Sequence, residues 1–170
     1  MDELFELAAL EAREKQPVPE PFPLAELVHD VVQKHGQEAG ARQLELVVDG
    51  DPDLPLAYAD LAMTERVLDN LIGNALRHGG TPCTVTLRCG HHERTGLPWL
   101  KVQDNGQGIS EEAINYLFEP FYTTAKDGNG LGLYLCRELC HANQATLDLE
   151  ETPKGASFVI TFAHPHRQFQ

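Results

Sequence analysis

Three glycines alternate at Gly128, Gly130 and Gly132, directly before residues 133–142, whose apolar side chains recur at helical spacing. A glycine-rich turn that leads into a helix offers backbone N–H groups and the positive end of the helix dipole, and both suit a phosphate chain. Glycine also permits positive φ and lets an anion approach without a Cβ in the way. Such turns also serve as ordinary helix caps, so this motif alone leaves both interpretations open.

Two asparagines, Asn70 and Asn74, are four residues apart within a stretch that reads as a helix from Asp60 to about His78. Residues at this spacing share one face of a helix. An asparagine amide oxygen is a suitable ligand for Mg²⁺, which prefers oxygen donors and keeps several waters. Hydrogen bonds from both amides to the local backbone are the alternative, and the pair alone does not decide between them.

A carboxylate and two glycines follow a predicted strand, in the run from Asp104 to Ile109. A carboxylate at a strand end can accept a hydrogen bond from the exocyclic amine of adenine. Gly106 and Gly108 let the backbone turn closely around a base. An ordinary Asp-Asn-Gly turn would have the same sequence, so this motif is also ambiguous by itself.

Composition limits the classes of function that remain. The chain has 170 residues, 42% of them hydrophobic, which fits one globular domain. No apolar run approaches the roughly 18 residues of a membrane helix, so we expect no membrane contact by this chain. The formal net charge of −13 argues against nucleic-acid binding, although a nucleotide can bind where backbone donors and a metal neutralise its phosphates. The four cysteines are expected to be buried, reduced thiols.

The elements that must position these residues are mixed in type. Helices are predicted over 24–38, 60–78, 111–117 and 133–142, and strands over 43–48, 56–58, 83–89, 99–103, 145–149 and 157–162. Because helices and strands do not alternate strictly, we predict an α/β two-layer sandwich. In it, one mixed β-sheet is covered on one face by about three helices.

The first 23 residues differ from the rest in composition. Residues 1–16 predict a short charged helix, too short to be stable alone, which resembles the truncated end of a longer dimerisation helix. Four prolines within 17–23 predict a stiff linker. We therefore place the main domain at 24–165 and a tail at 166–170.

Four motifs occur here in one order, at residues 69–78, 104–109, 118–121 and 128–133. This order closely resembles the ATP-binding catalytic domain of sensor histidine kinases. That domain belongs to a wider group that includes the ATP sites of type II topoisomerases, the Hsp90 chaperones and the MutL mismatch-repair proteins. The resemblance covers about residues 22–163 and implies the Bergerat ATP-binding fold.

The resemblance also implies a role for each matching residue. It assigns Asn74 to Mg²⁺, Asn70 to the phosphates, Arg77 and His78 to the side of the phosphate chain, and Asp104 to adenine. The other nucleotide-binding positions that it implies are Gly106, Gly108, Ile109, Phe121, Thr123, Thr124, Gly128, Gly130, Leu131, Gly132 and Leu133. Catalysis by Asn70, Asn74 and Arg77 would rest on positioning and charge neutralisation.

One position separates the classes within this group. The ATP-hydrolysing members carry a glutamate four residues before the metal-binding asparagine, as base for the attacking water. Here that position is Asn70, and an amide cannot take the proton. The resemblance therefore favours transfer of phosphate to a histidine over fast hydrolysis of ATP.

Residues 118–129 correspond to the lid over ATP. We expect Phe118 and Phe121 to anchor this lid by packing. We expect the lid residues Tyr122, Thr123, Thr124 and Lys126 to reach the phosphates when it closes. The lid sequence resembles the nitrogen-regulation subclass.

Two other stretches, 134–140 and 160–165, are similar to sensors of type IV pilus expression. A departure occurs at residues 142–144, which read Ala-Asn-Gln where most histidine kinases have His-Gly-Gly.

The phosphate-accepting histidine of this family lies in a pattern like His-Glu-x-x-Thr/Asn-Pro, which no stretch of this chain satisfies. His92 and Glu93 lie in a predicted hairpin loop without the spacing or the proline. We therefore expect a fragment of a larger, homodimeric kinase, from the cytoplasmic part of a membrane-bound sensor. Its expected partners are ATP or ADP, the histidine-bearing dimerisation domain and a response-regulator receiver domain. The alternatives are a non-catalytic nucleotide-binding or partner-binding module and, less favoured, an ATPase of this group.

Overall fold

The centre of the fold is a five-stranded mixed sheet with the strand order β2-β4-β5-β7-β6. The structure is a computed structural model that describes residues 3–51, 53–78, 83–123 and 130–163. The strands of this sheet are β2 Leu44–Gly50, β4 Cys83–His91, β5 Pro98–Asp104, β6 Thr146–Glu150 and β7 Ser157–Thr161. β2 and β4 pair in parallel, and the other three pairs are antiparallel.

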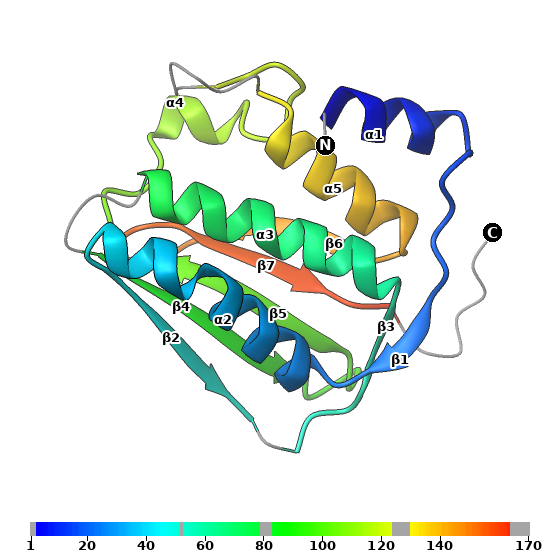
Figure 1. Cartoon of the computed structure of the whole chain (residues 1–170), viewed down its shortest axis with the longest axis horizontal. Coiled ribbons are helices and arrows are strands. Elements are labelled where there is room, and N and C mark those ends of the chain that lie inside the picture. The colour runs from blue at the N-terminus through cyan, green and yellow to red at the C-terminus, as the bar shows by residue number, and fades with distance from the viewer. Residues whose placement is uncertain (1–2, 52, 79–82, 124–129, 164–170) are drawn as a thin grey trace.

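Three helices cover one face of this sheet, namely α2 Leu24–Ala41, α3 Leu61–His78 and α5 Gly132–Ala142 (Figure 1). Two shorter helices, α1 Glu3–Glu11 and α4 Glu111–Ile114, complete the helical layer. The predicted two-layer α/β arrangement is therefore confirmed. The helix expected over 111–117 is shorter than predicted, and the one expected over 24–38 is longer.

The core lies between the two layers, because alternate residues of the strands face the helices. Val85 and Leu87 of β4 are fully buried against the helical layer. Thr86 and Arg88 belong to the other face of the sheet, where Arg88 lies opposite Lys101 of β5 in the antiparallel register. The ammonium group of Lys101 lies 4.6 Å from the ring centroid of Trp99 on that polar face.

A small two-stranded sheet joins the beginning of the chain to the main domain. β1 Glu20–Phe22 pairs antiparallel with β3 Ala57–Ala59. Phe22 is buried and packs edge-on against Phe162 at a centroid distance of 6.3 Å. Part of the segment expected as a linker is thus a strand. The division of the chain at residues 17–23 stays a prediction.

All four cysteines are buried and free, as expected. Burial raises the pKa of the Cys89 thiol to about 11 and that of Cys136 to about 12. Both thiols therefore stay protonated at neutral pH.

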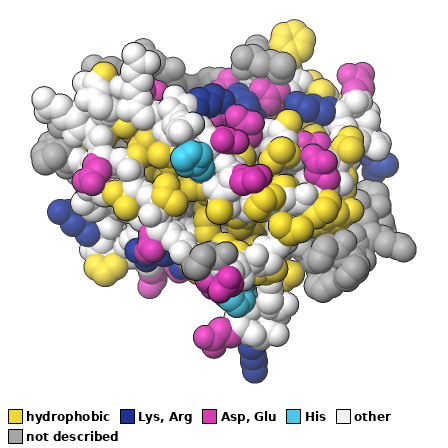
Figure 2. Space-filling view, turned by 60° about the horizontal axis from the view of Figure 1, so that its bottom comes forward, with side chains coloured by type: hydrophobic (Ala, Val, Ile, Leu, Met, Phe, Trp, Pro, Cys, Tyr) yellow, Lys and Arg dark blue, Asp and Glu magenta, His cyan; other side chains and the backbone are white. Residues whose placement is uncertain are grey.

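Hydrophobic side chains gather across the middle of the face shown in Figure 2, with carboxylates scattered among them. Within the described ranges, no group of three or more His, Cys, Asp or Glu side chains could hold a metal ion. None of the helices in those ranges is long and apolar enough to span a bilayer.

Candidate nucleotide site

The amide oxygens of both asparagines on α3 accept hydrogen bonds from arginines. Arg66 Nη1 lies 2.7 Å from Asn70 Oδ1, and Arg77 Nη2 lies 2.7 Å from Asn74 Oδ1. A Cβ on Gly73 would make an ordinary van der Waals contact with Arg77 Nη1, at 3.4 Å. Arg77 is exposed, so the Asn74 oxygen is held by a cationic group at the surface of the domain.

The side chains of Asp104, the last residue of β5, and Asn105 each accept a hydrogen bond that holds the loop after this strand. Asp104 Oδ1 accepts from the backbone N–H of Gly106 at 2.9 Å, which closes a turn. Asn105 Oδ1 accepts from the N–H of Thr84 at 2.9 Å, at the start of β4. The loop is therefore tied to the sheet. Asp104 is partly exposed at its edge.

Two glycines in left-handed conformations pack this loop against the turn between β6 and β7. Gly108 has φ +82° and Gly155 has φ +80°. A Cβ on Gly155 would lie 1.9 Å from the carbonyl oxygen of Asp104 and 2.8 Å from its Oδ1. A Cβ on Gly108 would lie 3.0 Å from the Gly155 oxygen. The sequence reasoning singled out Gly108 but missed Gly155, because a glycine between two strands is an ordinary turn signal.

The beginning of α5 offers backbone donors. Leu131 occupies the N-cap position and makes no side-chain cap. The first N–H groups of a helix have no partner within the helix, so this end suits an anion. Gly130 precedes it with φ +75°, and its carbonyl oxygen accepts from the N–H of Phe121 at 2.9 Å. A Cβ on Gly130 would lie 2.2 Å from the Phe121 carbonyl carbon, so only glycine fits there.

The two lid phenylalanines differ. Phe118 packs edge-on against Phe158 at 6.2 Å, and the Arg137 guanidinium lies 4.5 Å from its ring centroid, which confirms it as an anchor. The same expectation is wrong for Phe121, whose side chain is 68% exposed. Phe121 has φ +68°, and its backbone lies close to Gly130. This backbone contact does not bring the Phe121 ring into the core.

The structure brings the predicted segments together only in part. Figure 1 shows the end of α3, α4 and the beginning of α5 on the same side of the molecule. Ile109 packs against the core, Thr123 is exposed, and Gly132 and Leu133 are partly exposed in the first turn of α5. The predictions for Thr124, Lys126 and Gly128, and for the His78 side chain, lie outside the described residues.

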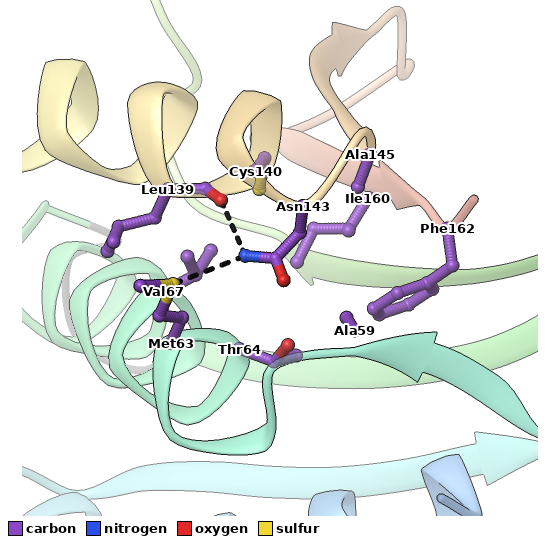
Figure 3. Close-up of a pocket in the computed structure, with 10 residues that line it drawn as sticks. All are labelled: Ala59, Met63, Thr64, Val67, Leu139, Cys140, Asn143, Ala145, Ile160 and Phe162. Carbon is purple, nitrogen blue, oxygen red and sulfur yellow. Dashed lines mark hydrogen bonds between the residues drawn. The ribbon is translucent and has the colours of Figure 1, made fainter. Parts of the chain in front are cut away.

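A small, mostly apolar cavity lies at the opposite end of α3, between its first turns and the last turns of α5 (Figure 3). Asn143 is buried there and donates from Nδ2 to the Leu139 carbonyl at 2.9 Å and to Met63 Sδ at 3.4 Å. Its Oδ1 accepts from the N–H of Asp60 at 2.7 Å. Gln144 takes φ +57°. Residues 142–144, which differ from the usual His-Gly-Gly, thus join the end of α5 to the start of α3. The cavity is lined by none of the predicted site residues.

Comparison with known proteins places this arrangement in a family. Residues 59–166 match the family model "Histidine kinase-, DNA gyrase B-, and HSP90-like ATPase". The chain is 37% identical over 161 residues to the sensor protein kinase PilS of Pseudomonas aeruginosa, which covers 92% of this chain and 30% of PilS. It is 36% identical over 114 residues to the histidine-protein kinase AfsQ2 of Streptomyces coelicolor, covering 64% of this chain and 20% of AfsQ2. The chain therefore spans less than a third of these relatives' length.

Solved structures give the same result. Full-length ShkA in complex with AMPPNP superposes with a TM-score of 0.83 at 26% identity, covering 96% of this chain and 34% of ShkA. The nucleotide-free catalytic domain of the histidine kinase ThkA superposes with a TM-score of 0.76 at 26% identity, covering 85% of this chain and 97% of that domain. The chain belongs to the histidine kinase-, DNA gyrase B- and HSP90-like ATPase family, in which it is a histidine-kinase catalytic domain.

Proposed function

We propose that this domain binds Mg²⁺ and ATP and transfers the γ-phosphate to a histidine on a separate dimerisation domain of the same kinase. The observation that carries the proposal is the chemistry at Asn70. Its amide oxygen accepts from Arg66 and its amide nitrogen has no basic lone pair. With no base at this position to activate water, a histidine imidazole supplied by another domain is the better acceptor.

Asn74 and Arg77 are the groups on α3 that can act on the phosphates. Asn74 Oδ1 would bind Mg²⁺, and Arg77, displaced from that oxygen, would turn its guanidinium to the phosphate chain. Since the described residues hold no acidic cluster, phosphate oxygens and waters would complete the metal's ligands. Bound Mg²⁺ supplies neutralisation of the charge on the phosphate oxygens.

The Asp104 carboxylate would accept a hydrogen bond from the adenine amine. Its Oδ1 already accepts from the Gly106 N–H, so its Oδ2 would be the acceptor for adenine. Gly106, Gly108 and Ile109 would shape the base pocket. The phosphates would lie against the backbone of the α5 start and the lid. We assign to that part the positions His78, Phe121, Thr123, Thr124, Gly128, Gly130, Leu131, Gly132 and Leu133.

The wider role is proposed from the relatives. PilS is described as a sensor protein kinase and aligns with 92% of this chain, which supports a PilS-like pathway for type IV pilus expression. The partners would be the histidine-bearing dimerisation domain and a response-regulator receiver domain, in a homodimeric, cytoplasmic assembly. Residues 1–16 would end the dimerisation helix, 17–23 link it to the catalytic domain at 24–165, and 166–170 form a tail.

Calorimetric titration with ATP, with and without Mg²⁺, tests this function. We expect wild-type binding that requires Mg²⁺, and a loss of about tenfold or more for Asp104→Asn, because one charge-assisted hydrogen bond is weakened. Asp49→Asn is the matched control, since Asp49 is exposed on β2 and pairs with Arg88. Radiolabelled phosphate should then move from ATP to a supplied histidine domain. A folded wild-type chain that binds no ATP would refute the proposal.

A further inference from the structure

A carboxylate of α1 is buried against α3. Glu6 is 4% exposed, and its Oε1 and Oε2 lie 3.1 and 3.4 Å from Arg66 Nε. Its neighbour Leu7 is also buried in the core, so this side of α1 packs on the domain. Because a buried carboxylate is costly unless it is paired, the ion pair with Arg66 makes this docking possible.

The same arginine reaches the proposed phosphate site. Arg66 donates from Nη1 to Asn70 Oδ1 at 2.7 Å, while its Nε donates to Glu6. A guanidinium is planar and rigid, so its position relative to Glu6 also sets its position relative to Asn70. Arg66, Asn70 and Asn74 follow one another at four-residue spacing along one face of α3. A continuous chain of contacts therefore runs from α1 through Arg66 to Asn70.

The Asn70 amide depends on this contact for its orientation. Its Nδ2 is buried and has no hydrogen-bond partner among the described residues. The thiol of Cys136, whose pKa is raised by burial and lowered in part by Asn70, is its neighbour on α5. With the oxygen bound to Arg66 and the nitrogen buried beside this thiol, the Arg66 hydrogen bond fixes which way the amide is turned. Without Arg66, the amide could rotate.

We infer that Glu6 and Arg66 are positioning residues for Asn70, so that packing of α1 on the domain sets the rate of phosphoryl transfer. This inference rests on the proposed function. When α1 packs, Glu6 holds Arg66, and Arg66 fixes the orientation of the Asn70 amide. When α1 separates, Arg66 loses its counter-ion and Asn70 loses its fixed orientation. A signal that moves α1 would thus reach the phosphates through two side chains.

Transfer kinetics with a supplied histidine domain test the inference. We expect Glu6→Gln and Arg66→Met each to slow transfer on the order of tenfold while Mg²⁺-dependent ATP affinity stays close to wild type. In an Asn70→Ala background, the same substitutions should cause no further loss. Glu38→Gln is the matched control, because Glu38 pairs with Arg42 on the exposed face of α2. Glu6→Gln changes charge but little shape, so it carries the test if Arg66→Met does not fold.

The Asn70 side-chain amide provides a readout that needs no nucleotide. Its ¹H–¹⁵N signals should shift in Glu6→Gln and stay unchanged in Glu38→Gln. The inference would be overturned if Glu6→Gln and Arg66→Met slowed transfer as much in the Asn70→Ala protein as in the protein that keeps Asn70. Unchanged Asn70 signals in Glu6→Gln would also overturn it. A wild-type chain that transfers no phosphate would overturn the proposed function instead, and the amide signals would still decide whether Glu6 orients Asn70.

Discussion

Replacing Gly155 by alanine tests whether the turn between β6 and β7 positions Asp104. A Cβ at residue 155 would lie 1.9 Å from the Asp104 carbonyl oxygen and 2.8 Å from its Oδ1. The first contact is to backbone at the end of β5, which is paired to β7 and cannot turn aside as a flexible side chain would. The substitution must therefore move the loop that carries the carboxylate.

The expected cost has two parts. An L-residue at φ +80° costs about 1–2 kcal/mol relative to glycine, and displacing packed neighbours costs about 1–3 kcal/mol more. Gly155→Ala should thus lower the free energy of unfolding by about 2–5 kcal/mol. The same substitution at Gly96 separates the cost of positive φ from the cost of displaced neighbours, because Gly96 has φ +71° but no atom within 4 Å of its Cβ position. Gly96→Ala should cost only about 1–2 kcal/mol.

Two measurements decide the outcome. Urea unfolding can be followed through Trp99, the single tryptophan, and ATP affinity by calorimetry. We expect Gly155→Ala to lose stability and ATP affinity together, and Gly96→Ala to keep wild-type affinity. If Gly155→Ala were no less stable than Gly96→Ala, or bound ATP like the wild type, the steric argument would be wrong.

Three further predictions concern parts of the molecule outside this turn. Asn143→Ala should destabilise the fold by about 2–3 kcal/mol in urea unfolding, because it leaves the Asp60 N–H without its partner; an unchanged midpoint would contradict this. Gln144→Gly should raise the free energy of unfolding by about 1 kcal/mol, since Gln144 has φ +57°, and a lower value would argue against left-handed strain. The hydrogen bond from Lys101 lowers the pKa of the Glu150 carboxyl, although partial burial opposes this shift. The ionised carboxyl therefore stabilises the fold at pH values above its pKa in the unfolded chain, and this stabilisation is lost as the pH falls through its pKa in the folded protein. The stability difference between wild type and Glu150→Gln should therefore shrink between neutral and acidic pH in urea titrations, whereas a constant difference would exclude this linkage.

Local patterns predicted most of the elements. The 3.6-residue spacing of apolar side chains predicted α3 and its limits, and Asp60 caps it as expected, with Oδ1 accepting from the Met63 N–H at 3.0 Å. The bounds of β2 and β4 were likewise predicted to within two residues. These elements were predictable because their signals lie within a few residues of sequence.

Features that depend on distant partners were not predictable. β1 is three residues long and contains Pro21, so it reads as linker until β3 pairs with it. A glutamate in a short charged helix reads as solvated, yet Glu6 is buried by Arg66, which lies 60 residues further along the chain. The motifs identified Asn70 and Asp104 as candidates, but not the groups that hold them in place.

Asn143 also determines which parts of the molecule can open separately. Because its side chain joins the last turn of α5 to the first residue before α3, these two helix ends must open as one cooperative unit. The first turn of α5 has no side-chain cap and is not part of that unit. The end of α5 is thus joined to the start of α3, whereas its beginning is joined to Phe121 through the Gly130 carbonyl.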